Sequence, residues 1–287
     1  MNNLFQTTRA RAARRTTLAC WCLALLGLPA LAQDVDKDSK EQLKVALSLP
    51  NKPGSLEVSL VNGFIHVTGY SGKEVVIDAV ARPGKPSRRS EASAPSGMRR
   101  LSAGTGLSLT AEEHNNRIEL STDSHMRPVD LTIKVPQNFS LQLGTVNNGD
   151  IIVENVSGVL EVSNVNGPIT LNQVSGSAVA STVNGNLTAT FKSVTNDAPM
   201  AFSTLNGKVD VTFPSNVRAA LKMKSDRGNV YSDFEVAVDK TPKVTRTAQN
   251  GLYRVSTDDW TYGKVNGGGA EVMMKTMNGD VLLRKAK

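Results

Sequence analysis

Five glycines recur at an interval of nine residues in the middle of the chain. They are Gly149, Gly158, Gly167, Gly176 and Gly185. The residue before each glycine alternates between asparagine and serine, so an identical pair recurs only every 18 residues. A fixed interval of this kind is typical of repeat proteins whose repeats stack on one another. We therefore expect coils that each contain an Asn-Gly corner and a Ser-Gly corner.

The same spacing defines the candidate corner residues. Glycine permits positive φ angles, and asparagine tolerates the left-handed region better than most residues. We expect Asn148, Asn166 and Asn184 to stack one per coil, as a ladder of side-chain amides. Asn-Gly pairs at 206–207, after a four-residue insertion, and at 278–279 continue the column, the second as the last coil. The candidate set is Asn148, Gly149, Ser157, Gly158, Asn166, Gly167, Ser175, Gly176, Asn184, Gly185, Asn206 and Gly207.

Apolar residues occupy fixed places in each repeat and predict a core. Two and four places beyond each glycine the chain holds apolar residues such as Ile151 and Val153, with polar residues between them. We expect these columns to point inward. The pattern predicts an all-β fold class, a single parallel β-solenoid with two short strands per coil of about 18 residues, interrupted by a basic loop and a hairpin. A third inward column is expected seven places beyond the glycines, at Val156, Val165, Val174 and Val183.

Composition divides the chain into a leader region and one domain. Residues 1–32 are typical of a signal peptide, residues 33–52 of a polar leader, and residues 53–287 of the solenoid domain. Residues 82–100 hold three prolines, two glycines, six basic residues and one acid, which predicts a flexible basic insertion. Asn115-Asn116 predicts the turn of a hairpin.

The first 32 residues carry the three parts of a secretory signal. Four arginines without an acid precede an apolar run from Leu18 to Leu28, and Ala30-Leu31-Ala32 offers a cleavage site. The run is shorter than the ~20 helical residues that span a bilayer. Arg14-Arg15 leaves the twin-arginine export route open beside the general one. We expect an exported protein that starts near Gln33, without a transmembrane segment after cleavage, and that is periplasmic, with the cell surface and secretion as alternatives.

Removal of the signal changes the charge and the cysteine content. The formal net charge of +7 falls to about +3, because the signal holds four arginines and no acid. Both cysteines, Cys20 and Cys22, lie in the signal, so neither disulfides nor thiolate ligands are expected in the mature chain. The small net charge, and a basic insertion without aromatic residues, argue against nucleic acid as a partner.

The regular repeats lack the residues that catalysis or metal binding needs. Calcium-binding nonapeptide repeats carry an acid soon after the glycine, but here only Asp150 does so. Between residues 141 and 191 the other charged residues are Glu154 and Glu161, too few and too dispersed for paired acid–base work. The three histidines have no metal-ligand spacing, and no serine lies in a nucleophile elbow. We expect no catalytic residue, cofactor or metal.

The basic insertion is the candidate for contact with a partner. Its paired arginines would meet an anionic glycan or lipid headgroup, or an envelope protein, with solubility alone as the alternative role. The candidate contact residues are Arg88, Arg89, Arg99 and Arg100.

The corner motifs resemble those of the bacterial putative-adhesin family, a family of unknown function. The string Val-Asn-Asn-Gly-Asp-Ile at 146–151, Val-Ser-Gly at 156–158 and Met-Asn-Gly-Asp-Val at 277–281 carry the resemblance, which covers residues 56–287. It implies a secreted or envelope-anchored β-solenoid without established enzymatic residues. The insertion at 82–100 departs from the compact family pattern.

These observations lead to a functional hypothesis. We expect a non-enzymatic exported envelope protein that serves as an interaction, adhesion or scaffolding module. An enzyme acting on envelope or extracellular polysaccharide is the first alternative, which acids or arginines clustered in one groove would support. An accessory subunit of an envelope stress-response or transport system is the second.

Overall fold

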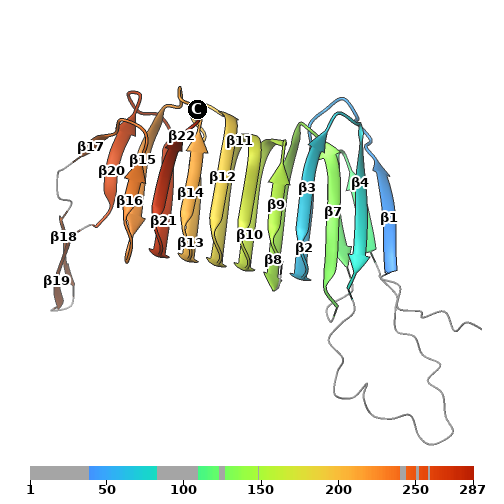
Figure 1. The fold of residues 1–287 in the computed structure, drawn as a ribbon, viewed down its shortest axis with the longest axis horizontal. Helices are drawn as coiled ribbons and strands as arrows, with labels where there is room; N and C mark the ends of the chain where they lie inside the picture. Colours follow the sequence, from blue (N-terminus) through green and yellow to red (C-terminus); the bar gives the residue numbers. More distant parts are fainter. Residues whose placement is uncertain are drawn as a thin grey trace, which may run out of the picture. The chain divides into compact units, whose positions relative to one another are not determined.

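Figure 1 shows a computed structural model of the protein, in which residues 39–82, 109–122, 127–147, 149–239, 244–249, 252–257 and 259–287 are described. All of these residues belong to one compact unit, Asp38–Lys287. Every regular element of the described residues is a β-strand. The all-β prediction is therefore confirmed.

The described residues form 22 strands, of which 20 belong to one sheet while β18 and β19 form a separate two-stranded sheet. In chain order the strands are β1 (Ser39–Ala46), β2 (Gly54–Asn62), β3 (Ile65–Tyr70), β4 (Glu74–Ala81), β5 (Leu109–His114), β6 (Arg117–Thr122), β7 (Val129–Pro136), β8 (Phe139–Asn147), β9 (Ile151–Glu154), β10 (Ser157–Asn166), β11 (Ile169–Asn184), β12 (Leu187–Val194), β13 (Met200–Asn206), β14 (Val209–Phe213), β15 (Ala219–Ser225), β16 (Val230–Ser232), β17 (Ala237–Asp239), β18 (Val244–Gln249), β19 (Leu252–Thr257), β20 (Thr261–Val265), β21 (Glu271–Asn278) and β22 (Val281–Lys285).

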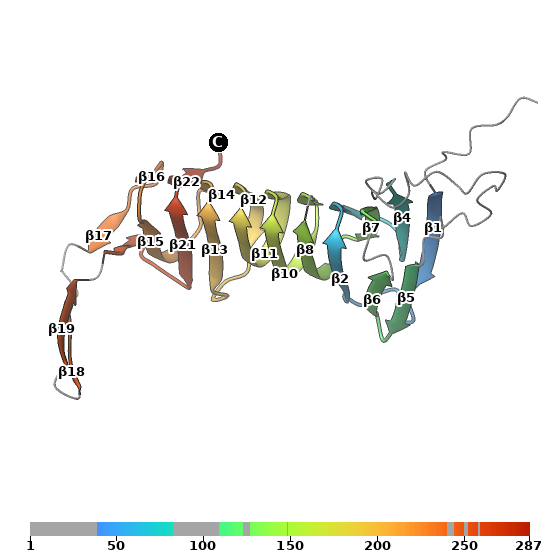
Figure 2. The same ribbon diagram turned by 90° about the horizontal axis from the view of Figure 1, so that it is seen from below.

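The large sheet consists of two rows of strands that lie on opposite sides of one core. One row is here named the serine face. Its strands have the order β5-β6-β2-β8-β10-β11-β13-β21-β15-β20-β17 (Figure 2). The other, the threonine face, has the order β1-β4-β7-β3-β9-β11-β12-β14-β22-β16. The long strand β11 contributes to both rows and joins them.

The register of the central coils follows the spacing of the glycines. Ser157 pairs with Ser175, and Ile151 pairs with Ile169, an offset of 18 residues in both rows. These central strands pair in parallel. The next offset grows to 22 residues, because the insertion noted in the sequence lies between β12 and β13.

The sheet is mixed, so the predicted parallel solenoid is confirmed in the central coils and not at the ends of the stack. Near one end of the stack β4 pairs antiparallel with both β1 and β7, and β5 pairs antiparallel with β6. Near the other end β20 pairs antiparallel with β15 and β17. A parallel stack leaves an open core and a regular unpaired edge at each end, and antiparallel returns cover both with short connections. The predicted hairpin is β5–β6, whose turn residues Asn115 and Asn116 have φ angles of 54° and 65°.

The order of the coils in space differs from their order in the chain at both ends. The coil of β21 and β22, made last, lies between the β13–β14 coil and the β15–β16 coil. Likewise the β2–β3 coil lies between β6–β7 and β8–β9. The expectation that the Asn-Gly pair at 278–279 marks the last coil of the stack was therefore wrong.

The core consists of the inward columns, with one correction. Residues two and four places beyond each glycine are buried throughout, as Ile151 and Val153 show. In the third column Val156 and Val174 are buried, but two members are 37% and 38% exposed, at Val165 and Val183. The reason is local. A left-handed residue, Asn155 (φ 56°) or Gln173 (φ 54°), interrupts the in-and-out alternation of side chains just before each buried valine, so that valine turns inward. No such residue precedes Val165 or Val183, where β10 and the second half of β11 keep alternating and the valine points outward.

Candidate functional site

The Asn-Gly corners form a column in which each glycine packs on the backbone of the coil below. A Cβ atom on Gly167 would lie 2.1 Å from the carbonyl oxygen of Gly149, and one on Gly185 would lie 2.2 Å from that of Gly167. Gly207, Gly279 and Gly228 extend the column with the same contact at 2.1 Å. Of these five, only Gly207 and Gly279 have positive φ angles. Close approach of two backbones, more than backbone conformation, requires glycine here.

A ladder of exposed asparagines runs beside this glycine column. The Nδ2 of Asn184 donates to Oδ1 of Asn166 at 2.8 Å, and Asn206 donates to Asn184 at 2.7 Å. Asn278 continues the ladder with a 2.6 Å bond to Asn206. Asn166 donates in turn to Oδ1 of Asn147 at 3.2 Å. Asn148, the expected first rung, lies outside the described residues.

A second, buried ladder was missed from the sequence. The hydroxyl of Thr182 donates to the carbonyl oxygen of Gly167 at 2.9 Å, and Thr204 makes the same bond to Gly185 at 2.9 Å. In four further coils a side chain in the equivalent place donates to the carbonyl oxygen of a glycine. These side chains belong to Thr145, Asn164, Thr276 and Ser225. The signal was present in the sequence, since a hydroxyl or amide residue stands three places before most of the corner glycines.

The Ser-Gly pairs lie just beyond the second bend of each coil. The bends themselves are made by the left-handed residues Asn155 and Gln173, two places before Ser157 and Ser175. The serines pair with each other within the sheet, followed by the pairing of Gly158 with Gly176. A Cβ on Gly176 (φ 112°) would lie 2.0 Å from the carbonyl oxygen of Gly158. These pairs therefore act in stacking the strands, next to the turn and not in it.

Several predicted segments lie outside the described residues. They include the signal at 1–32 and residues 83–100 of the basic insertion, and with the latter Arg88, Arg89, Arg99 and Arg100. Arg82, at the start of that insertion, is described, and its Nε lies 2.7 Å from Oδ2 of Asp130. The polar leader is described from Ser39, where β1 pairs antiparallel with β4.

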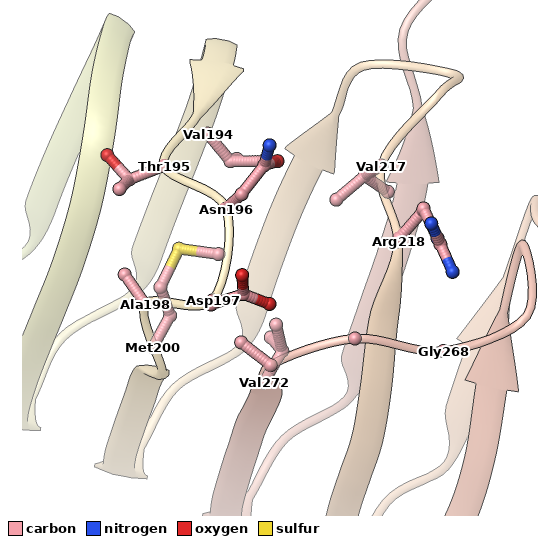
Figure 3. A pocket seen from close by; sticks show the side chains of 12 residues that line it. Val194, Thr195, Asn196, Asp197, Ala198, Met200, Val217, Arg218, Gly268 and Val272 are labelled. Carbon is pink, nitrogen blue, oxygen red and sulfur yellow. The ribbon is translucent and has the colours of Figure 1, made fainter.

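The insertion between β12 and β13 opens a cleft of about 220 Å³ at the edge of the stack. Its other walls come from the segments before β15 and before β21. Figure 3 shows apolar side chains such as Met200, Val217 and Val272 in it, with the charged groups of Asp197 and Arg218 on different walls. Both charged residues are exposed, and within the described residues no ion pair joins them. A cleft smaller than the ~300 Å³ of common ligand pockets, with its charges in water, is a poor binding site.

An acid–base pair lies on the threonine face. Nε2 of His66 is 3.1 Å from Oε2 of Glu154, and Asn172 donates to Oε1 of Glu154 at 3.2 Å. The hydrogen bond from Asn172, and then that from His66, lower the pKa of Glu154. The hydroxyl of Thr68 lies 3.5 Å from the same Nε2. A catalytic histidine uses one nitrogen for the nucleophile and the other for its orienting acid. Here both neighbours share one nitrogen, so the arrangement is not a triad.

The described part of the chain lacks both clustered metal ligands and a membrane-spanning helix. It contains no group of three or more His, Cys, Asp and Glu side chains that could hold a metal ion. Nor does it contain a helix long and apolar enough to cross a membrane.

The serine face presents the main unexplained surface. Its outward residues include a row of small side chains that the strand pairing aligns, here named the serine groove: Ser59, Gly144, Ser163, Ser181 and Ser203. A hollow of about 410 Å³ lies over the first four of these positions. On one side the groove is flanked by exposed aliphatic residues, here named the apolar rim: Val61, Val146, Val165, Val183 and Leu205.

This face also concentrates exposed apolar residues. Among the described residues ten large hydrophobic side chains are exposed, and seven of them lie on the outward side of the serine face: the five of the apolar rim, Val159 and Val179. Scattered exposed hydrophobics are normal, but a contiguous patch marks an interaction surface. The sequence held this signal in the aliphatic residues that precede Asn147, Asn166, Asn184 and Asn206, which the inward assignment of the third column concealed.

Comparison with known proteins identifies the family of this chain. The model of the Toastrack DUF4097 family matches residues 38–284, which confirms the family resemblance inferred from the corner motifs. No protein with a curated description matches the chain. A putative cell adhesion protein from Clostridium sporogenes has 10% identity and a TM-score of 0.45, with 87% of this chain and 100% of that chain covered. A putative adhesin from Bacteroides fragilis has 10% identity and a TM-score of 0.39, with 87% and 98% covered.

The glycine column yields a stability prediction with a matched control. Gly167→Ala places a methyl group against the carbonyl of Gly149, so we expect the free energy of unfolding to fall by more than about 2 kcal/mol. Gly144→Ala is the control, since its Cβ would lie at an ordinary 3.4 Å from Oγ of Ser163. Denaturant unfolding followed by circular dichroism measures both. Equal stabilities of the two variants would contradict the close-approach argument.

The asparagine ladder yields a smaller effect. Asn166→Val removes the bonds to Asn147 and from Asn184, and we expect a loss of about 1–2 kcal/mol, or ~2–6 °C in melting temperature. Asn196→Val is the control, because Asn196 is exposed and lies in the insertion, away from the ladder. Thermal unfolding is the measurement, and an unchanged melting curve for Asn166→Val would show that the ladder contributes no stability.

Proposed function

This chain belongs to the Toastrack DUF4097 family, and from that premise we propose that it is an exported, non-enzymatic interaction module of the bacterial envelope. The described coils act as a rigid scaffold whose flat faces are available for contact. Adhesion and scaffolding are the two forms that such contact would take.

The observation that carries this proposal is the exposed apolar surface of the serine face. Burying a side chain such as Val179, which is 49% exposed, against a partner removes apolar area from water and stabilises the complex. The serine side chains of the serine groove are short, so they lose little rotamer freedom when a partner binds. The surface is held by paired strands on a packed core, so little ordering is needed on binding.

Export is supported by the composition of the first 32 residues. A basic start, an apolar run and an Ala-x-Ala end are the features that a signal peptidase recognises. The stack also fits an oxidising compartment, because it is held by backbone pairing and apolar burial and needs no cysteine chemistry.

The export proposal predicts the N-terminus of the protein in its own cells. We expect intact-mass analysis of the envelope fraction to show a chain that begins at Gln33. Ala32→Arg places a large charged residue at the cleavage site and should leave the signal uncleaved. Full-length protein in the cytoplasmic fraction of wild-type cells would refute export.

The interaction proposal predicts which face contacts a partner. A photo-crosslinking amino acid at Val179, on the serine face, should give a crosslinked species in intact cells. The same group at Thr188, on the threonine face, is the matched control and should give none or far less. Crosslinking from Thr188 alone, or from neither position, would refute the assignment to the serine face.

A further inference from the structure

We propose that the serine face binds a second copy of this chain, with the two faces packed together in antiparallel order. The inference rests on the proposed function, since it names the partner of the same surface. Its basis is a symmetry in the strand order and in the charges of the serine face.

One row of outward residues runs across the whole face, strand by strand, and is here named the central row. In spatial order it is Glu112, Glu119, Glu57, Gln142, Glu161, Val179, Ala201, Met273, Lys222, Tyr262 and Asp239. Glutamates occupy one half, apolar residues the middle, and Lys222 the other half. Val179 stands at the centre, on β11, with five strands on either side.

A two-fold axis along β11 brings the halves of the central row together. Rotation about this axis reverses the order of the strands and keeps the position along each strand, so β2 faces β15, β8 faces β21 and β10 faces β13. Glu57 then lies opposite Lys222 of the second copy. Val179 and Val183, both on β11, lie opposite themselves. A parallel arrangement would instead place Glu57 on Glu57 and Lys222 on Lys222.

The middle of the apolar rim is self-complementary under the same rotation, whereas Val61 on β2 comes opposite Asp226 at the end of β15. Val165 on β10 comes opposite Leu205 on β13, and these side chains are 37% and 43% exposed. Val146 on β8 comes opposite Met277 on β21. Such a contact has an apolar centre and a charged margin, which is the anatomy of specific interfaces.

The other charged groups within the contact are compatible with this arrangement. Lys275 on β21 comes opposite Gly144 of the second copy, whose neighbouring strand carries Glu161. Glu271 comes opposite the uncharged Ser140 of the second copy. Lys224 is already paired with Asp226 at 2.9 Å. Glu57 has Arg117 of its own chain at 2.8 Å, so it exchanges or shares that partner on association.

The outermost strands lie outside the contact. Glu112 and Asp239 would repel each other there, as would Arg117 and Lys264, but the twist of each sheet separates the ends of two packed faces. The remaining seven strands, β2 to β15, span about 30 Å, and four outward residues per strand span about 20 Å. Each copy therefore buries on the order of 600 Å², which together meets the lower limit of about 1,200 Å² for specific interfaces.

The test is the oligomeric state of the full-length gene product after export, measured by sedimentation velocity over a concentration series. We expect a monomer–dimer equilibrium. Glu57→Lys and Lys222→Glu should each raise the dissociation constant at least about tenfold, the equivalent of 1.4 kcal/mol. The double variant Glu57→Lys/Lys222→Glu should restore dimerisation, because the charges are exchanged and not lost.

Two further variants separate this contact from other causes. Val179→Glu places like charges opposite each other at the axis and should abolish the dimer, while Thr188→Glu on the threonine face should not. Circular dichroism confirms that each variant is folded. A monomer at every concentration, a dimer indifferent to Val179→Glu, or an absence of rescue in the double variant would each overturn the proposal.

The crosslinking at Val179 distinguishes this proposal from the more general one. A product of twice the chain mass supports the second copy. A product of another mass leaves the interaction function in place and refutes self-association. Absence of any product refutes the assignment of the interaction to the serine face.

Discussion

The contact on which the structure depends is the approach of one backbone to another at the Asn-Gly corner. At Gly167 the chain comes so close to the carbonyl of Gly149 that no side chain fits between them. That carbonyl is satisfied by a buried amide from Asn164 at 2.8 Å, and the exposed asparagines bond to each other outside it. The corner thus combines steric fit, a buried hydrogen bond and a solvent-facing ladder within a few residues. The described residues contain no cysteine, so their stack depends on the repetition of this unit.

The parts of the fold that follow from local chemistry were accessible from the sequence, and the parts that follow from tertiary pairing were not. The 18-residue coil, the inward position of Ile151 and the hairpin at Asn115 rest on spacing and turn chemistry, and all were predicted. The exposure of Val165 was not, because a single left-handed residue in the other half of the coil changes which valines face inward. The insertion of the last coil between two earlier ones has no local signal at all.

The same separation holds for the candidate site. The predicted corner residues serve the stack itself, and the predicted arginines lie outside the described residues. The surface that remains, the serine face, was concealed by the assumption that every regular valine belongs to the core. In a solenoid the outward residues repeat as faithfully as the inward ones, so a regular apolar column is not evidence of burial. The alternation along each individual strand decides the matter.

The position of β21 and β22 has a consequence for the order of events in the cell. Four strands from two different coils, β13, β14, β15 and β16, depend on this last segment for a neighbour. The two parts of the stack therefore cannot join until residues 271–285 are available to lie between them. A chain that ends before residue 271 would leave these four strands without that neighbour, and an unpaired strand edge is a template for pairing with another chain.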